Sequence, residues 1–183
     1  MKNQPLYNMP CPIARSLGRI GDGWSILIMR DALAGFTRFD EFQKSSGVAP
    51  NILSRRLKEL VDDGLLEKVC YSTSPARFEY HLTAVGRDFR GVILALTEWG
   101  SSHFSPEGRQ MQLVETATQR PVKMQMVDSE NGQPLTLDKY QMVPGPAAEP
   151  MMHYRHDYLQ KKRAGDTAQK FAPPALCEPQ SSR

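Results

Sequence analysis

The sequence has no long apolar run, and this absence excludes a class of protein. None of its 183 residues lies in a stretch of roughly 18 consecutive apolar residues, the length of a membrane-spanning helix. The longest apolar cluster, residues 24–29, ends at Arg30 and Asp31. The residues that follow Met1 contain no apolar segment typical of a secretory signal. We therefore expect a cytoplasmic protein that does not bind a membrane.

Cysteine is also scarce. Cys11, Cys70 and Cys177 are widely separated, and no Cys-x-x-Cys pair occurs, so neither a disulfide framework nor a zinc ribbon is indicated. The four histidines are scattered over different predicted elements, and the sequence lacks a Gly-x-Ser-x-Gly motif, a phosphate-binding loop and a dinucleotide fingerprint. We expect no enzyme activity, no metal site and no cofactor.

Net charge is low as well. The chain carries 23 Lys and Arg against 20 Asp and Glu, a formal charge of +3. A protein that holds nucleic acid by overall charge has a larger basic excess. Any DNA binding must therefore depend on basic residues placed locally.

The spacing of apolar and turn-forming residues predicts an ordered series of elements before residue 104. They are helices at 12–22 and 24–34, an extended piece at 36–39, a brief helix capped by Asp40, a helix from Pro50 to Asp63, strands at 65–71 and 77–82, and a helix at 84–103. This is the order of a winged helix-turn-helix. The predicted fold is mainly α-helical with a small β-wing, and a small appendage follows it.

The helix that begins at Pro50 is the candidate recognition helix. Its apolar residues are Leu53, Leu57, Leu60 and Val61, and these share one side. The residues of this helix predicted to contact DNA are Pro50, Asn51, Ser54, Arg55, Arg56 and Lys58. Arg can donate two hydrogen bonds to guanine and Asn can pair with adenine. An ordinary amphipathic surface helix shows similar residues, so the hypothesis depends on the flanking turn, glycine stop and hairpin.

Two further surfaces have candidate roles. Ser72, Thr73 and Arg77 at the hairpin tip can contact phosphates or a minor groove, although a solvated turn has the same composition. The helix at 84–103 has a long apolar stripe that includes Phe89 and Trp99. A two-fold dimer would bury such a stripe and present two recognition helices to half-sites. Alternatively, the stripe belongs only to the core of the single domain.

Several segments together are similar to one family. They are Cys11-Pro12-Ile13-Ala14, the run from Ile20 to Leu33, Arg38-Phe39-Asp40-Glu41-Phe42, the run from Ile52 to Leu60, Asp63-Gly64-Leu65-Leu66, the run from Phe78 to Thr83, Gly86 and Trp99. This combination resembles the HxlR-type winged helix regulators over about residues 10–104. The resemblance implies a homodimeric bacterial transcription factor that dimerises through the first and last helices of the domain and acts on a palindromic operator, in our interpretation as a repressor.

The resemblance also implies two possible signals. Some HxlR-type proteins sense oxidants or electrophiles through a cysteine just before the first helix, and Cys11 matches that position. A thiol at a helix N-terminus can have a lowered pKa, although an idle cysteine is the simpler alternative. A small-molecule effector is the second possibility, with a pocket beside Trp24, Phe89 and Trp99.

The domain division follows from composition. We expect an N-terminal arm at 1–10, the DNA-binding and dimerisation domain at 11–104, a small β-rich extension at 105–146, and a linker and largely disordered tail at 147–183, in which 151–163 could form a short helix. Residues 111–146 resemble a cysteine-rich, ribbon-like extension of some HxlR-type relatives. This chain lacks those cysteines, so its extension should be metal-free.

A different function is compatible with the same fold. Winged helices can lose DNA binding and use the same face for proteins, and Glu59, Asp62 and Asp63 favour this alternative. Arg55, Arg56 and Lys58 together favour DNA.

Overall fold

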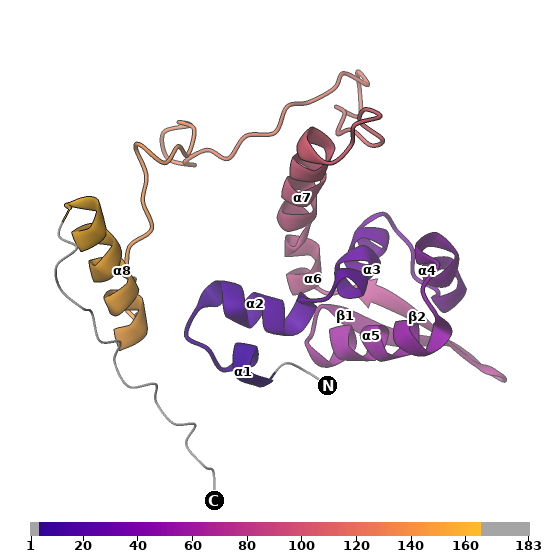
Figure 1. Cartoon of the computed structure of the whole chain (residues 1–183). Coiled ribbons are helices and arrows are strands. Elements are labelled where there is room, and N and C mark those ends of the chain that lie inside the picture. The colour runs from indigo at the N-terminus through magenta and orange to yellow at the C-terminus, as the bar shows by residue number, and fades with distance from the viewer. Residues whose placement is uncertain (1–3, 166–183) are drawn as a thin grey trace, which may run out of the picture.

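The computed structural model describes residues 4–165 (Figure 1). Its elements are α1 (Gln4–Tyr7), α2 (Pro12–Ile20), α3 (Gly23–Leu33), α4 (Phe39–Ser46), α5 (Pro50–Asp62), β1 (Leu66–Thr73), β2 (Ala76–Leu82), α6 (Ala84–Asp88), α7 (Arg90–His103) and α8 (Pro150–Arg163). Helices with a small two-stranded antiparallel sheet form a winged helix-turn-helix, as predicted. Among the described residues, no helix combines the length and apolar character that a membrane crossing requires.

The core lies where α3, α4 and α5 meet. Ile28, Phe42, Leu53 and Leu57 are fully buried there. Leu53 and Leu57 are one turn apart, so both reach the same side of α5. Burying each such side chain stabilises the fold by about 1.5–3 kcal/mol. The apolar side of α5 is thus held against the domain, and its opposite side remains exposed.

The turn between α4 and α5 is formed by Gly47, whose φ of 67° is left-handed. Its backbone N–H donates to the carbonyl of Gln43 at 2.9 Å and closes α4. Val48 then points into the core, and Pro50 occupies the first turn of α5, where its missing N–H costs nothing. The predicted glycine turn and proline start are confirmed.

The predicted cap of α4 is wrong in its residue. The helix begins at Phe39, and the Glu41 carboxylate accepts the N–H groups of Thr37 and Arg38, both at 2.9 Å. Asp40 is exposed and pairs with Lys44 at 3.6 Å. Glu41 serves as the cap because its longer side chain reaches back to the amides that precede the helix.

The wing is the hairpin of β1 and β2, paired from Leu66 opposite Leu82 to Thr73 opposite Ala76. The extended piece before α4 adds to it, because the N–H of Tyr80 donates to the carbonyl of Thr37 at 2.7 Å. The start of α4 is therefore tied to the base of the wing.

The long helix predicted at 84–103 is divided in two at Phe89. Thr83 caps α6 as expected, since its hydroxyl accepts the N–H of Gly86 at 3.1 Å. The carbonyl of Phe89 accepts the N–H of Val92 at 3.0 Å, a tightened 3₁₀-type bond. Phe89 itself packs against the core, which fixes the position of the break.

The predicted N-terminal arm contains the single-turn helix α1. The guanidinium carbon of Arg19 lies over the ring of Tyr7, 4.4 Å from the ring centroid. The hydroxyl of Tyr7 donates a hydrogen bond to the Asp63 carboxylate. These contacts dock the segment on α2 and on the end of α5.

After α7 the chain differs from the prediction. Residues 105–149, here called the C-terminal coil, contain two isolated bridges (Val114 with Pro121, Val127 with Pro134) and no regular strand. Each bridge ends at a proline, which lacks the N–H that would continue a ladder. The expectation of a β-rich extension is therefore wrong.

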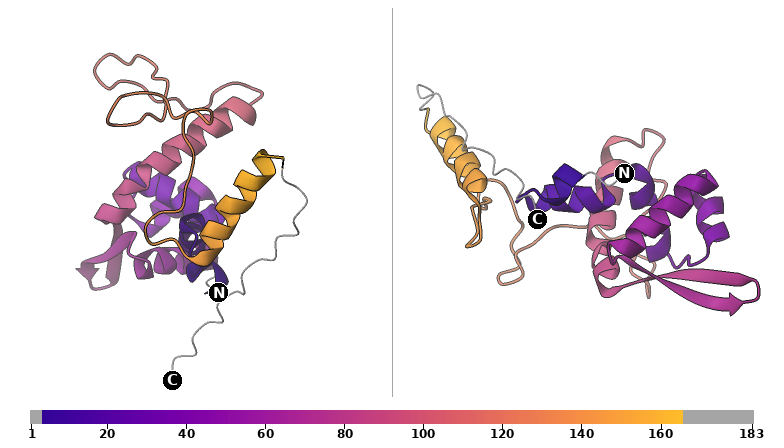
Figure 2. Two further views of the ribbon diagram at one scale, coloured as in Figure 1. Left: turned by 90° about the vertical axis from the view of Figure 1, so that its left-hand side faces the viewer. Right: turned by 90° about the horizontal axis from the view of Figure 1, so that it is seen from below.

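The segment after the coil also differs. Helix α8 occupies most of residues 147–165, so the short helix expected at 151–163 is confirmed, whereas the linker and largely disordered tail expected around it are not seen in this part. Figure 1 and the right-hand view of Figure 2 show the coil leaving α7 and leading to α8, which lies outside the packed helices of the domain on the side of α1 and α2. Residues 166–183, with Cys177, lie outside the described part of the chain.

Candidate nucleic-acid interface

The exposed side of α5 carries most of the predicted contact residues. Pro50, Asn51, Ser54 and Arg55 are all exposed in its first two turns. Lys58 follows one turn later, with 75% of its side chain exposed, and its ammonium group pairs with Asp62 at 2.8 Å. The structure therefore brings these five side chains together on one surface.

Arg56 does not belong to this surface. Its Nε lies 3.1 Å from Oδ1 of Asp22, and its guanidinium donates to the Glu59 carboxylate at 2.6 Å. Only 19% of its side chain is exposed. The structure turns Arg56 away from the other predicted contact residues, because an acid from the α3 N-terminus draws it to the flank of α5.

At the wing tip, one of the three predicted contact residues is engaged in a hydrogen bond within the turn, and the other two are exposed. The hydroxyl of Ser72 donates to the carbonyl of Pro75 at 3.0 Å and is engaged in holding the turn. Thr73 and Arg77 are exposed. In the right-hand view of Figure 2 the hairpin projects beyond the helices, so these two side chains lie at the outer end of the domain.

Two cations that sequence analysis missed lie along the wing. The Nε of Arg38 donates to Glu79 at 3.0 Å, and its guanidinium lies over the ring of Tyr71 at 4.9 Å. The Lys68 ammonium lies 3.8 Å from the ring centroid of Phe78. The hydrogen bond to Glu79 is the main reason that the pKa of Arg38 is raised. Because these contacts join residues distant in sequence, no local pattern revealed them.

A cleft of about 280 Å³ separates the start of α4 from the wing. Residues that line it include Arg38, Asp40, Tyr71, Arg77, Phe78 and Tyr80. Half of these six side chains carry a charge, and Arg38 and Arg77 supply the positive ones. The cleft thus extends the cationic edge of the domain from the wing to α4.

Cys11 is half-buried and immediately precedes α2. The backbone N–H of Ala14 is the main reason that the pKa of its thiol is lowered, opposed by partial burial and aided by the N–H of Ile13 and the guanidinium of Arg155. Arg155 belongs to α8. Its approach to Cys11 could not be predicted locally, because α8 is far away in sequence.

The three residues of the predicted ligand pocket are not brought together. Phe89 packs against the core at the beginning of α7, whereas Trp99 stacks edge-on against Phe104 at 4.9 Å near its end. Ten helical residues separate them, about 15 Å along the axis. Trp24 is partly exposed at the start of α3. The prediction of a shared pocket is therefore wrong for the single domain.

Comparison with known proteins decides the family. The HxlR-like helix-turn-helix model matches residues 19–108. An HTH-type transcriptional regulator of Mycobacterium tuberculosis, Rv3095, described as uncharacterised, is 33% identical over 135 residues, which cover 73% of this chain and 85% of that protein. The chain belongs to the HxlR-like helix-turn-helix family.

Two solved structures resemble this HxlR-like protein over most of its length. A proposed transcription factor from Pseudomonas aeruginosa, PA1374, is 49% identical, with a TM-score of 0.59, and the match covers 79% of this chain and 99% of that one. PA1607, also a proposed transcription factor, is 40% identical, with a TM-score of 0.69 and coverage of 77% and 99%. The family domain ends at residue 108, so a match of 135 residues to Rv3095 must extend beyond that domain. It therefore includes part of the C-terminal coil.

Family and fold together define the general function of this HxlR-like chain. It is a transcriptional regulator of the helix-turn-helix type, and the partner of its winged helix is DNA.

Proposed function

We propose that this regulator is a dimeric repressor in which residues 11–104 bind a palindromic operator and form the dimer contacts. The observation that carries the proposal is the two-sided character of α5. Leu53 and Leu57 anchor the helix in the core, and Asn51, Ser54 and Arg55 are exposed on the other side. Recognition helices contact bases mainly from their N-terminal turns, where these three residues lie.

Each exposed side chain has a distinct chemical role. Arg55 donates two bonds to a guanine edge, and Asn51 pairs with adenine. Ser54 and Lys58 reach base edges or phosphates, which position the helix without reading sequence. On the wing, Arg77 enters the minor groove and Thr73 contacts phosphate. To these we add Arg38, whose guanidinium Glu79 and Tyr71 hold beside the cleft.

The dimer is supported by apolar side chains left exposed on two helices. On α2, Ile13 is 70% exposed and Leu17 is exposed as well. On α7, Val92, Leu96 and Trp99 are exposed at helical spacing, and Trp99 reaches 56%. Exposed apolar patches of this kind mark interfaces between proteins. A two-fold axis beside α2 and α7 would cover both sets.

The releasing signal is, in this proposal, oxidation of Cys11. The backbone amides at the start of α2 and the Arg155 guanidinium favour the thiolate by lowering its pKa. The thiolate is the form that a peroxide oxidises: sulfur attacks one peroxide oxygen, the O–O bond breaks, and the departing hydroxide takes a proton from solvent and leaves as water, so that the anionic thiolate becomes a neutral sulfenic acid. Because Cys11 begins a helix of the dimer surface, a changed charge at Sγ can alter how the two recognition helices are spaced.

Binding to the DNA upstream of the protein's own gene tests the proposal. We expect the dimer to bind one site there, with an affinity that falls linearly with salt on logarithmic axes by a slope of about −0.9 for each phosphate neutralised. A duplex of the same composition and shuffled sequence is the control. Equal binding to both duplexes, or a protein partner captured equally well with excess competitor DNA, would support the protein-interaction alternative.

A further inference from the structure

The C-terminal coil contains two turns that are built alike. In the first, the N–H of Gln119 donates to the carbonyl of Glu115 at 2.8 Å, and the Thr118 hydroxyl donates to the Glu115 carboxylate at 2.6 Å. In the second, the N–H of Gly132 donates to the carbonyl of Asp128 at 2.8 Å, and the Asn131 amide donates to the Asp128 carboxylate at 2.8 Å.

The likeness extends to backbone and sequence. Gln119 and Gly132 have φ values of 57° and 69°, and an isolated bridge closes each turn. The segments 114–122 (VETATQRPV) and 127–135 (VDSENGQPL) share Val, an acid and Pro at matching positions, a repeat that sequence analysis missed. Each turn is thus held by its own hydrogen bonds and keeps its shape without packing on the domain.

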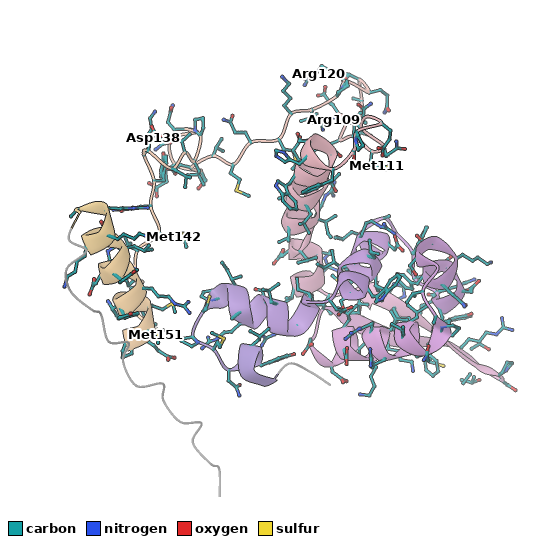
Figure 3. The ribbon with its side chains drawn as sticks, viewed as in Figure 1. Arg109, Met111, Arg120, Asp138, Met142 and Met151 are labelled. Atoms are coloured by element: carbon teal, nitrogen blue, oxygen red, sulfur yellow. The ribbon has the colours of Figure 1, made fainter. Side chains whose placement is uncertain are left out.

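The coil has little connection to its own domain. Its root is fixed by Arg109, which donates two hydrogen bonds to the Glu98 carboxylate at 2.7 and 2.8 Å. For residues 110–149, the hydrogen bonds described stay within the coil or reach residues of α8, among them Gln160. Figure 3 shows Arg109 and Met111 at the far end of α7, Arg120 further out, and Asp138 and Met142 on the part that leads to α8.

The same coil exposes large apolar side chains. Leu137 is 100% exposed and Met142 is 93% exposed, and Met111 and Met126 are exposed too. The accessible area of the chain is 13984 Å², whereas a compact monomer of its mass exposes about 8,900 Å². Allowing about 3,400 Å² for the residues outside the described part, about 1,700 Å² of excess remains. This is more than the about 800 Å² that each partner buries in a standard interface.

From these observations we infer that the C-terminal coil packs on a second copy of this chain, across the dimer interface proposed above. The coil begins directly after α7, whose exposed apolar side chains belong to the proposed dimer surface. Charge agrees with this partner. Residues 105–149 carry six acidic and four basic side chains, whereas α2 carries Arg15 and Arg19 and no acid. An acidic coil is repelled by DNA and attracted by the α2 of another copy.

Photo-crosslinking in the full-length protein tests this inference. Leu137 is replaced by p-benzoylphenylalanine in a ¹⁵N-labelled preparation, which is then exchanged with unlabelled wild type and irradiated. We expect labelled coil peptides joined to unlabelled peptides from residues 11–22 or 90–104. The matched control places the probe at exposed Lys44 on α4, where we expect no such products. Crosslinks that join labelled coil peptides only to other labelled peptides would overturn the inference. So would a crosslink yield no higher than that of the control.

A second measurement removes the apolar contact itself. In the double variant Leu137→Lys and Met142→Lys, we expect the dimer dissociation constant from sedimentation to rise at least about tenfold, because two buried side chains are lost. Ser129→Lys, on an exposed part of the coil, is the control. An unchanged constant in a protein that still dimerises and binds operator would refute the coil contact alone. A wild-type chain that is monomeric at every concentration would also refute the proposed dimer.

Discussion

The Nε of Arg56 lies 3.1 Å from Oδ1 of Asp22, so a side chain of α5 joins the residue that caps α3. Asp22 also accepts the N–H of Ser25 at 3.0 Å. One carboxylate therefore closes the start of α3 and holds α5 beside it. The orientation of the candidate recognition helix depends on this contact as well as on its leucines.

We predict that Arg56→Ala destabilises the protein by about 1–3 kcal/mol, because a partly buried donor set is lost and Asp22 and Glu59 are left without their partner. Chemical denaturation gives the free energy of unfolding. Arg55→Ala is the matched control and should remain within about 0.5 kcal/mol of wild type, since Arg55 is exposed. Equal stability of the two variants would contradict the role given to Arg56.

The core beneath α5 gives a larger effect. Leu57→Ala should lower the free energy of unfolding by about 2–5 kcal/mol, because it leaves a cavity where the side chain was fully buried. Lys44→Ala on exposed α4 should stay close to wild type. A loss below about 1 kcal/mol for Leu57→Ala would mean that α5 is not anchored by this face.

The cap of α4 should depend on pH. The N–H groups of Thr37 and Arg38 hold the pKa of Glu41 below its usual 4.5. A carboxylate whose pKa is depressed on folding stabilises the folded state above its unfolded pKa, and this contribution is lost as pH falls through the folded value. Glu41→Gln should therefore lower the melting temperature at pH 7 and have progressively less effect in acid. An equal effect at pH 7 and pH 3 would contradict the cap.

Cys11 should react faster than Cys70, whose environment offers no cation or helix amide of the same kind in the described contacts. Alkylation of each thiol, followed by mass spectrometry across a pH series, measures this. In Arg155→Gln we expect the profile of Cys11 to move to higher pH, because the pKa of the thiol rises, while Cys70 stays unchanged. A profile of Cys11 that does not move would show that α8 has no influence on it.

The oxidant response has its own test. Cys11→Ser should keep operator binding and lose its sensitivity to peroxide, because serine cannot be oxidised in this way. Cys70→Ser is the matched control and should respond like wild type. A Cys11→Ser protein that still leaves DNA on oxidation would remove Cys11 from the mechanism.

Much of the domain could be predicted because its signals are local. Pro50, the spacing of Leu53 and Leu57, and the glycine after the helix define α5 without reference to the rest of the chain. Arg56 could not be placed in this way, since its direction is set by Asp22 of a different helix. The Arg38–Glu79 and Cys11–Arg155 contacts escaped prediction for the same reason, because each joins distant segments.

The region after α7 was predicted less well. A β-rich extension was predicted there, but Pro121 and Pro134 end each bridge before a ladder can grow. Composition suggested a largely disordered tail beyond residue 147, within which a short helix at 151–163 was expected. Pro150 at the first turn and Lys and Arg in the last turn are good ends for α8, which confirms that helix.

Operator binding by two adjacent arginine variants tests the central claim most directly. Fluorescence anisotropy on the upstream DNA should show that Arg55→Ala weakens binding by about 1–3 kcal/mol and relaxes preference at one base pair, as expected for a lost bidentate contact. Folded Arg56→Ala should keep the base preference of wild type. If Arg55→Ala binds the operator as tightly and as selectively as wild type, the exposed face of α5 does not read DNA.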